Sequence, residues 1–202
     1  HPGFGKSEPS ENIKDVEDLV YFYRAFLDHM GISKIHIVGQ SLGGWIAAEF
    51  AISQTHRVNK LVLTAAAGLY VPGAERVDPF MLNQETLIDI MYCDQHLAQA
   101  AKEKSRTDEA QNLFIKNRTA FARLTWDRFF NPKLQKYLKW IDVPTLIVWG
   151  EEDRVISPEH GKVFQENIPG AQLKLIPQCG HLPYVEKTEE YAKIIHHFIQ
   201  TS

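Results

Sequence analysis

The chain has 202 residues, a formal net charge of −3 and 44% hydrophobic residues, which is the composition of an ordinary globular protein. This length is sufficient to bury a core without a disulfide framework or a structural metal. The near-neutral charge balance excludes the basic surface of a nucleic-acid binder, and no run of about 18 apolar residues is present to span a membrane.

The first 65 residues alternate between helix and strand signals. Apolar residues recur at helical spacing over 12–30, and a short β-rich run follows at 34–38. Residues 42–53 contain several alanines and few helix breakers, whereas 60–64 has the composition of a short buried strand. This order predicts βαβ units and a parallel sheet.

Residues 70–140 have a different character, because no strand-like run occurs there. Helices are expected near 83–104, 107–124 and 131–140. Four aromatic side chains are expected to form the core of this segment or to pack on the sheet, with one or two of them lining an acyl pocket as the alternative: Phe121, Trp126, Phe129 and Phe130.

The strand pattern resumes at 144–150 and is followed by a helix at 158–166, a strand at 172–176 and a last helix at 189–200. The simplest organisation is an α/β core that is interrupted by one helical insertion. The expected divisions are residues 1–69 for the first part of the core, 70–140 for the insertion and 141–202 for the second part of the core.

A G-x-S-x-G motif lies between the strand at 34–38 and the helix at 42–53, with Ser41 at its centre. In this context a tight, strained turn lifts the serine hydroxyl clear of the sheet, and glycine is expected on both sides to avoid clashes. The Leu42 N–H at the start of the helix is the predicted oxyanion-hole donor. The alternative is a glycine-rich turn with an incidental serine.

A serine hydroxyl needs a base, and the base needs a group that orients it. His181 follows the strand at 172–176, and an acidic run of Glu151, Glu152 and Asp153 follows the strand at 144–150. The carboxyl ends of parallel strands form the ligand crevice of such sheets, so the three groups are expected to meet there. The alternatives are a solvated loop acid and a surface histidine.

The other potential ligands indicate neither a metal site nor a cofactor site. The remaining histidines form no H-x-x-x-H pair, and the two cysteines, Cys93 and Cys179, form no CxxC motif. Two reduced thiols fit a reducing compartment, so we expect a cytoplasmic protein. Secretion stays open, because a signal peptide would lie upstream of the turn-forming run at the start of the sequence.

Several segments together resemble the α/β-hydrolase superfamily. They are the loop at 1–7, the nucleophile elbow at 39–44, the strand and acid loop at 144–153, and the histidine segment at 179–181 with Glu186 downstream. The resemblance implies a Ser-His-Asp triad of Ser41, His181 and Asp153, and a helical cap at 70–140. The implied fold class is α/β, with the C-terminal part of a mostly parallel sheet and helices on both of its faces.

The sequence also departs from the pattern of that family. In the family, the loop similar to residues 1–7 follows the first four strands, and an H-G dipeptide upstream supplies a second oxyanion N–H. The expectation is therefore that roughly 70 N-terminal residues are missing. The strand before Ser41 would then be an exposed edge of the sheet, and a missing segment or another copy of the chain is the expected partner.

The resemblance implies a carboxylesterase-like serine hydrolase that cleaves a small-molecule ester through an acyl-enzyme. A carbon–carbon bond hydrolase of ring-cleavage products is the alternative, although those enzymes often carry Trp where Leu182 follows His181 here. Perhydrolase activity is also compatible with the triad. The two remaining alternatives are a non-catalytic ligand-binding protein of the same fold and an inactive fragment.

Overall fold

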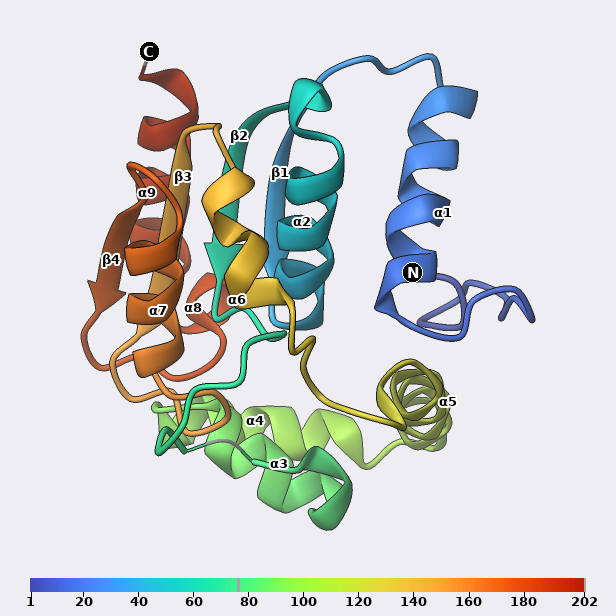
Figure 1. Cartoon of the computed structure of the whole chain (residues 1–202). Coiled ribbons are helices and arrows are strands. Elements are labelled where there is room, and N and C mark those ends of the chain that lie inside the picture. The colour runs from blue at the N-terminus through green and yellow to red at the C-terminus, as the bar shows by residue number, and fades with distance from the viewer. Residues whose placement is uncertain (76, 202) are drawn as a thin grey trace.

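The computed structural model describes residues 1–75 and 77–201; position 76, inside the predicted insertion, lies outside the described residues. Its centre is a four-stranded parallel sheet with the strands in chain order (Figure 1). The strands are β1 (Ile35–Gln40), β2 (Val58–Thr64), β3 (Thr145–Gly150) and β4 (Gln172–Ile176). This topology confirms the α/β fold class and brings all four carboxyl ends to one edge.

Helices cover both faces of the sheet, as predicted. One face packs against α2 (Leu42–Ser53) and α7 (Glu159–Asn167), and the other packs against α9 (Thr188–Gln200) (Figure 1). On the first side, α1 (Val16–His29) packs on α2. Side chains alternate along each strand, so the first face receives Leu61, Leu63, Ile147 and Trp149, and the second receives Val62, Leu146, Val148 and Ile176. This burial on both faces explains why the two central strands, β2 and β3, are short apolar runs in the sequence.

The bounds of α1 differ from the predicted helix at 12–30 because capping groups fix both ends. The Asp15 carboxylate accepts a hydrogen bond from the Asp18 N–H at 2.9 Å, so the helix begins at Val16. At the other end Gly31 adopts φ +66°, and the Ile32 N–H closes back onto the Leu27 carbonyl.

The strand that carries the elbow, β1, lies at an edge of the sheet. Within the described residues it has β2 as its partner on one side and no strand on the other. Val38 near its end is 48% exposed. The expectation of an exposed edge strand before Ser41 is confirmed.

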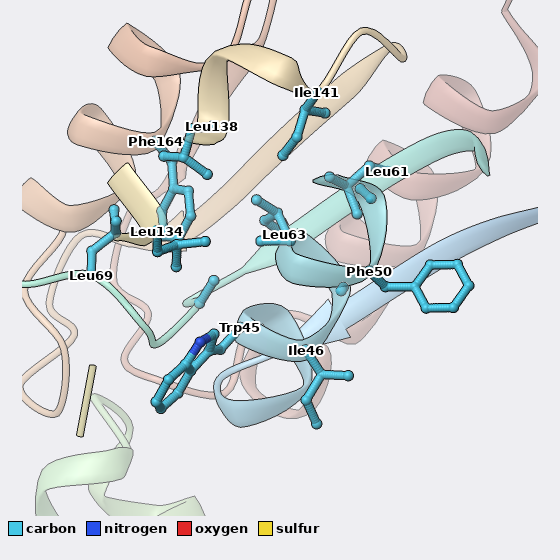
Figure 2. Packing of buried hydrophobic residues seen from close by; sticks show 14 of the residues in the cluster. Trp45, Ile46, Phe50, Leu61, Leu63, Leu69, Leu134, Leu138, Ile141 and Phe164 are labelled. Carbon is cyan, nitrogen blue, oxygen red and sulfur yellow. The ribbon is translucent and has the colours of Figure 1, made fainter. Parts of the chain in front are cut away.

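Several helices connect β2 to β3. They are η2 (Pro79–Met81), α3 (Gln84–Met91), α4 (Gln95–Ser105), α5 (Asp108–Thr125), α6 (Leu134–Tyr137) and η3 (Leu138–Trp140). Of these, α3, α4 and α5 lie beyond the carboxyl ends of the strands (Figure 1). In contrast, Leu134, Leu138 and Ile141 pack into the main core beside α2 and β2 (Figure 2). The division into core and cap stays a prediction.

The predicted helix at 83–104 is two helices, α3 and α4. Asp94 begins the second one, because its carboxylate accepts hydrogen bonds from the His96 and Leu97 N–H groups. Tyr92 is extended at the end of the first one. The Asp94 carboxylate thus takes N–H groups that would otherwise donate to carbonyls of a continuous helix, and the helix is interrupted there.

The aromatic cluster of this segment has a different membership from the predicted one. Phe121 and Phe129 lie with their ring centroids 6.1 Å apart, and Phe80 packs on both at 5.5 Å. Trp126 ends α5 and is 87% exposed, so it does not belong to the cluster. Phe80 was missed because it lies about 40 residues upstream in a 3₁₀ turn.

None of the helices in the described part of the chain is long and apolar enough to cross a membrane.

Leu63→Ala tests the packing of the core between β2 and the helices above it. Leu63 is fully buried, so the substitution removes apolar contacts and leaves a cavity. We expect the free energy of unfolding in urea to fall by about 2–5 kcal/mol. Leu113→Ala, at a side chain that is 41% exposed, is the matched control and should have little effect. Equal effects of the two substitutions would contradict the assigned core.

Candidate active site

The three predicted catalytic side chains come from loops that follow three different strands. Ser41 follows β1, Asp153 follows β3 and His181 follows β4, all at the carboxyl edge of the sheet. The described non-glycine residues with positive φ lie at the same edge: Ser41 (52°), Ala65 (43°) and Gln178 (52°). Such conformations cost free energy and are retained where the surrounding structure imposes them, often at functional sites.

Close backbone contacts hold the elbow around Ser41. A Cβ on Gly39 would lie 2.3 Å from the Gly43 carbonyl oxygen, so this position requires glycine. Gly43, in contrast, would meet nothing within 4 Å, so the expectation that it must be glycine is wrong. The second steric requirement is at Gly44, where a Cβ would lie 2.5 Å from that of Ala66. The helix thus approaches the β2 loop closely at Gly44.

Hydrogen bonds of the main chain fix the position of Ser41. Its N–H donates to the Thr64 carbonyl, and its own carbonyl accepts from Trp45 and Ala67, each at 3.0–3.1 Å. The bond from Trp45 is the first of the helical pattern in α2. The Leu42 N–H therefore precedes the intrahelical bonds and is available to a developing oxyanion, in keeping with its predicted role.

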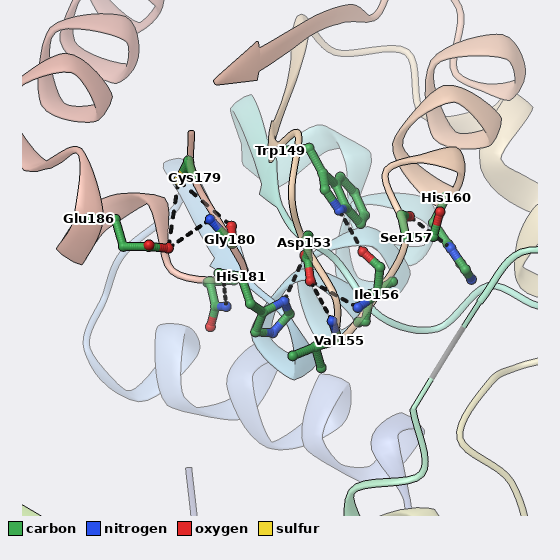
Figure 3. Close-up of polar contacts among 11 residues, drawn as sticks. Trp149, Asp153, Val155, Ile156, Ser157, His160, Cys179, Gly180, His181 and Glu186 are labelled. Carbon is green, nitrogen blue, oxygen red and sulfur yellow. Dashed lines mark hydrogen bonds and ion pairs between the residues drawn. The ribbon is translucent and has the colours of Figure 1, made fainter. Parts of the chain in front are cut away.

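The Asp153 carboxylate is buried and has a donor on each oxygen (Figure 3). Oδ1 accepts hydrogen bonds from the Val155 and Ile156 N–H groups at 2.9 and 3.0 Å, and Oδ2 lies 2.8 Å from His181 Nδ1. The indole of Trp149 donates to the Ile156 carbonyl and holds the same loop. These bonds offset the cost of removing the carboxylate from water and fix its direction.

The contact with Asp153 determines which nitrogen of His181 carries a proton. An ionised carboxylate only accepts hydrogen bonds, so Nδ1 carries the hydrogen and Nε2 is left as the basic atom. Within the described residues no hydrogen bond joins the Ser41 hydroxyl to this ring. Such contacts are often long without substrate. The Gln40 side chain links the two loops by donating to the His181 carbonyl at 3.2 Å.

Of the three consecutive acids, only Asp153 meets the histidine ring. Glu152 is occupied elsewhere, because its Oε2 accepts a hydrogen bond from the Cys179 N–H at 2.9 Å. Glu151 is exposed. The geometry thus favours Asp153 as the orienting acid, and its catalytic role stays a prediction.

A thiol nucleophile is disfavoured at the carboxyl ends of the strands. Burial raises the pKa of the Cys179 thiol to about 12, so the thiol is protonated at neutral pH and is a poor nucleophile. Among residues 1–75 and 77–201, no group of three His, Cys, Asp or Glu side chains is arranged to hold a metal ion.

The sequence patterns did not predict the residues that connect the loops of the predicted triad. The roles of Gln40, Arg154 and Glu186 depend on contacts between distant segments, and Glu186 was noted only as part of a resemblance. The one feature of the sequence that points to these residues is their position, because each lies within five residues of a predicted triad member.

Comparison with known proteins agrees with this fold. The alpha/beta hydrolase family profile matches residues 1–194, so the chain belongs to the alpha/beta hydrolase family. A curated relative, the 2-hydroxy-6-oxononadienedioate/2-hydroxy-6-oxononatrienedioate hydrolase of Klebsiella pneumoniae, is 30% identical over 219 residues. The alignment covers 98% of this chain and 74% of the relative.

Solved structures lead to the same family. The meta-cleavage product hydrolase CumD of Pseudomonas fluorescens IP01, in a serine-to-alanine variant with acetates, aligns with a TM-score of 0.75 and 27% identity over 98% of this chain and 76% of that one. A membrane phospholipase A described as a bacterial virulence factor aligns with a TM-score of 0.80 and 27% identity over 98% and 67%. Together these relatives support a hydrolase.

Asp153→Asn tests the orienting role of the acid. The amide would preserve the shape of the side chain but would no longer fix the Nδ1–H form of His181, so Nε2 would lose its basic character. We expect kcat for p-nitrophenyl acetate to fall by about 10³- to 10⁴-fold. Glu151→Gln is the control for the loss of one negative charge in this loop. A variant Asp153→Asn with wild-type kcat would contradict the assignment.

Proposed function

We propose that this chain is a serine-dependent hydrolase of a carbon–carbon bond next to a ketone, in a dienoate of the kind produced by aromatic ring cleavage. The observation that carries this proposal is the similarity, at about 30% identity across 98% of the chain, to 2-hydroxy-6-oxononadienedioate hydrolases. The likeness to a meta-cleavage product hydrolase at 27% identity supports the same substrate class.

In this proposal, the arrangement around Ser41 performs the first half of the reaction. The Ser41 hydroxyl adds to the ketone carbon, and Nε2 of His181 takes its proton. Asp153 stabilises the resulting imidazolium through the 2.8 Å contact with Nδ1. The Leu42 N–H, at the positive end of α2, donates a hydrogen bond to the oxyanion.

The nature of the leaving group separates this reaction from ester cleavage. Before cleavage, the dienoate must shift to its 2-oxo-3-enoate tautomer, in which the 2-hydroxyl loses its proton and the carbon next to the ketone gains one. When the carbon–carbon bond then breaks, its electron pair is delocalised through the remaining double bond onto the 2-oxo group. His181 then returns its proton to the departing fragment. Water activated by His181 hydrolyses the acyl-serine, releases a carboxylic acid and restores Ser41, so that the net reaction consumes one water.

Ester hydrolysis is the second candidate, and two observations favour it. Leu182 follows His181, where ring-cleavage hydrolases often carry Trp. The phospholipase A structure is as similar in sequence as the CumD structure, at 27% identity. The same triad serves an ester, because an alkoxide leaves more readily than a carbon fragment. The substrate that is turned over therefore decides between the two candidates.

The deciding experiment compares two substrates on the purified chain. We expect 2-hydroxy-6-oxononadienedioate to be hydrolysed with a kcat/KM at least about 10-fold above that for p-nitrophenyl butyrate, measured by loss of the dienoate absorbance and by release of nitrophenol. Ser41→Ala should reduce turnover of both by about 10³-fold or more, because it removes the nucleophile.

Each other outcome contradicts the proposal in a distinct way. A preference for the ester would favour the second candidate. Tight binding of the dienoate with no turnover would favour a non-catalytic binding protein. Labelling by a fluorophosphonate, mapped to Ser41 by mass spectrometry, provides an independent measure of whether the nucleophile is reactive.

A further inference from the structure

The histidine loop is attached to the helical segment by main-chain contacts. The His181 N–H donates to the Met91 carbonyl at 2.8 Å, at the end of α3. A Cβ on Gly180 would lie 2.7 Å from that carbonyl oxygen and 2.9 Å from the Cys93 nitrogen. The two backbones are therefore in direct contact beside the predicted catalytic base.

Glu186 joins the same two segments through its carboxylate, and Figure 3 shows its contact with Gly180. Oε1 accepts the Gly180 N–H at 2.7 Å, and Oε2 accepts the N–H groups of Cys93 and Asp94 at 2.7 and 2.9 Å. Glu186 is half-buried in the four-residue helix α8 (Pro183–Glu186), immediately after the histidine loop. One carboxylate thus satisfies three backbone donors that belong to two distant parts of the chain.

The acid loop is attached to the same junction by Arg154. One guanidinium nitrogen donates to the Asp89 and Tyr92 carbonyls at 2.6 and 2.7 Å. The end of α3 and the residues before α4 therefore contact both loops that carry the His–Asp pair. A displacement of this junction would be transmitted to the Asp153–His181 contact.

We infer that Glu186 is a positioning residue that couples the α3–α4 junction to His181. Through three charge-assisted hydrogen bonds, it holds Gly180, next to His181, at a fixed distance from the helical segment. This inference rests on the proposed function insofar as His181 is the base. The inference adds a role for the helical segment, which helps to orient His181 as well as lying over the carboxyl ends of the strands.

Three variants of Glu186 test this inference. Glu186→Ala leaves all three donors without their acceptor, whereas Glu186→Gln retains one carbonyl oxygen and satisfies part of the set. We expect kcat for p-nitrophenyl acetate to fall by about 10- to 100-fold in the alanine variant with KM nearly unchanged, and by less in the glutamine variant. The double variant Glu186→Ala with Arg154→Met should lose less than the product of the two single effects, since both act through one junction.

The matched control is Glu189→Gln, which changes an exposed carboxylate of α9 and should leave kcat, KM and the melting temperature unaltered. Amide hydrogen exchange at His181, Cys93 and Asp94 gives a readout that does not require activity. We expect faster exchange at these amides in Glu186→Ala, in a protein that still melts cooperatively.

The outcomes distinguish this inference from the proposed function. A wild-type chain without Ser41 labelling, but with faster exchange at His181 in Glu186→Ala, would reject the proposed function and retain the coupling. Wild-type kcat and exchange in the alanine variant would overturn the coupling while leaving the proposed function intact. The coupling would also be overturned if Glu186→Ala raised KM by the same factor as it lowered kcat, and if Glu186→Gln were equally impaired. That pattern would indicate a general structural role for Glu186.

Discussion

The loops at the carboxyl ends of the strands are arranged around one buried carboxylate, that of Asp153. The Asp153 side chain is fully buried, so its carboxylate depends on the hydrogen-bond donors that surround it. Two of those donors are backbone N–H groups of its own loop, and the third is the ring of His181. Stabilising the charge therefore also fixes the loop conformation and the direction of the imidazole. A single electrostatic requirement thus serves both folding and chemistry.

Local sequence patterns predicted those parts of the molecule that local forces determine. The alternation of helix and strand, the elbow at Ser41 and the acid and histidine loops all follow from patterns within about 15 residues. The requirement for Gly44 instead of Gly43 was missed, because it depends on how closely α2 approaches Ala66 in space. For the same reason, the sequence did not predict that Phe80 belongs to the aromatic cluster. Nor did it predict that Glu186 links two loops. In both cases the contacts involve residues far away along the chain.

The segment between β2 and β3 combines two kinds of attachment. Its last part is held by apolar burial, with Leu134 and Leu138 in the main core. The junction between α3 and α4 is held instead by the charged side chains of Arg154 and Glu186, which bind main-chain atoms there. Apolar burial tolerates small shifts, whereas charge-assisted hydrogen bonds are directional. The directional contacts lie where precise geometry matters most, beside the proposed catalytic pair.

The contrast between Trp126 and Trp149 gives the molecule two distinct optical environments. The indole of Trp126 is 87% exposed at the end of α5, whereas that of Trp149 is fully buried and donates to the loop that follows Asp153. A water-exposed indole emits at longer wavelength and is accessible to collisional quenchers such as iodide, and a buried one is shielded. Trp45 is buried and Trp140 is exposed as well, so both would first be replaced by phenylalanine. The fluorescence of the two remaining indoles could then distinguish events at the helical segment from events at the acid loop.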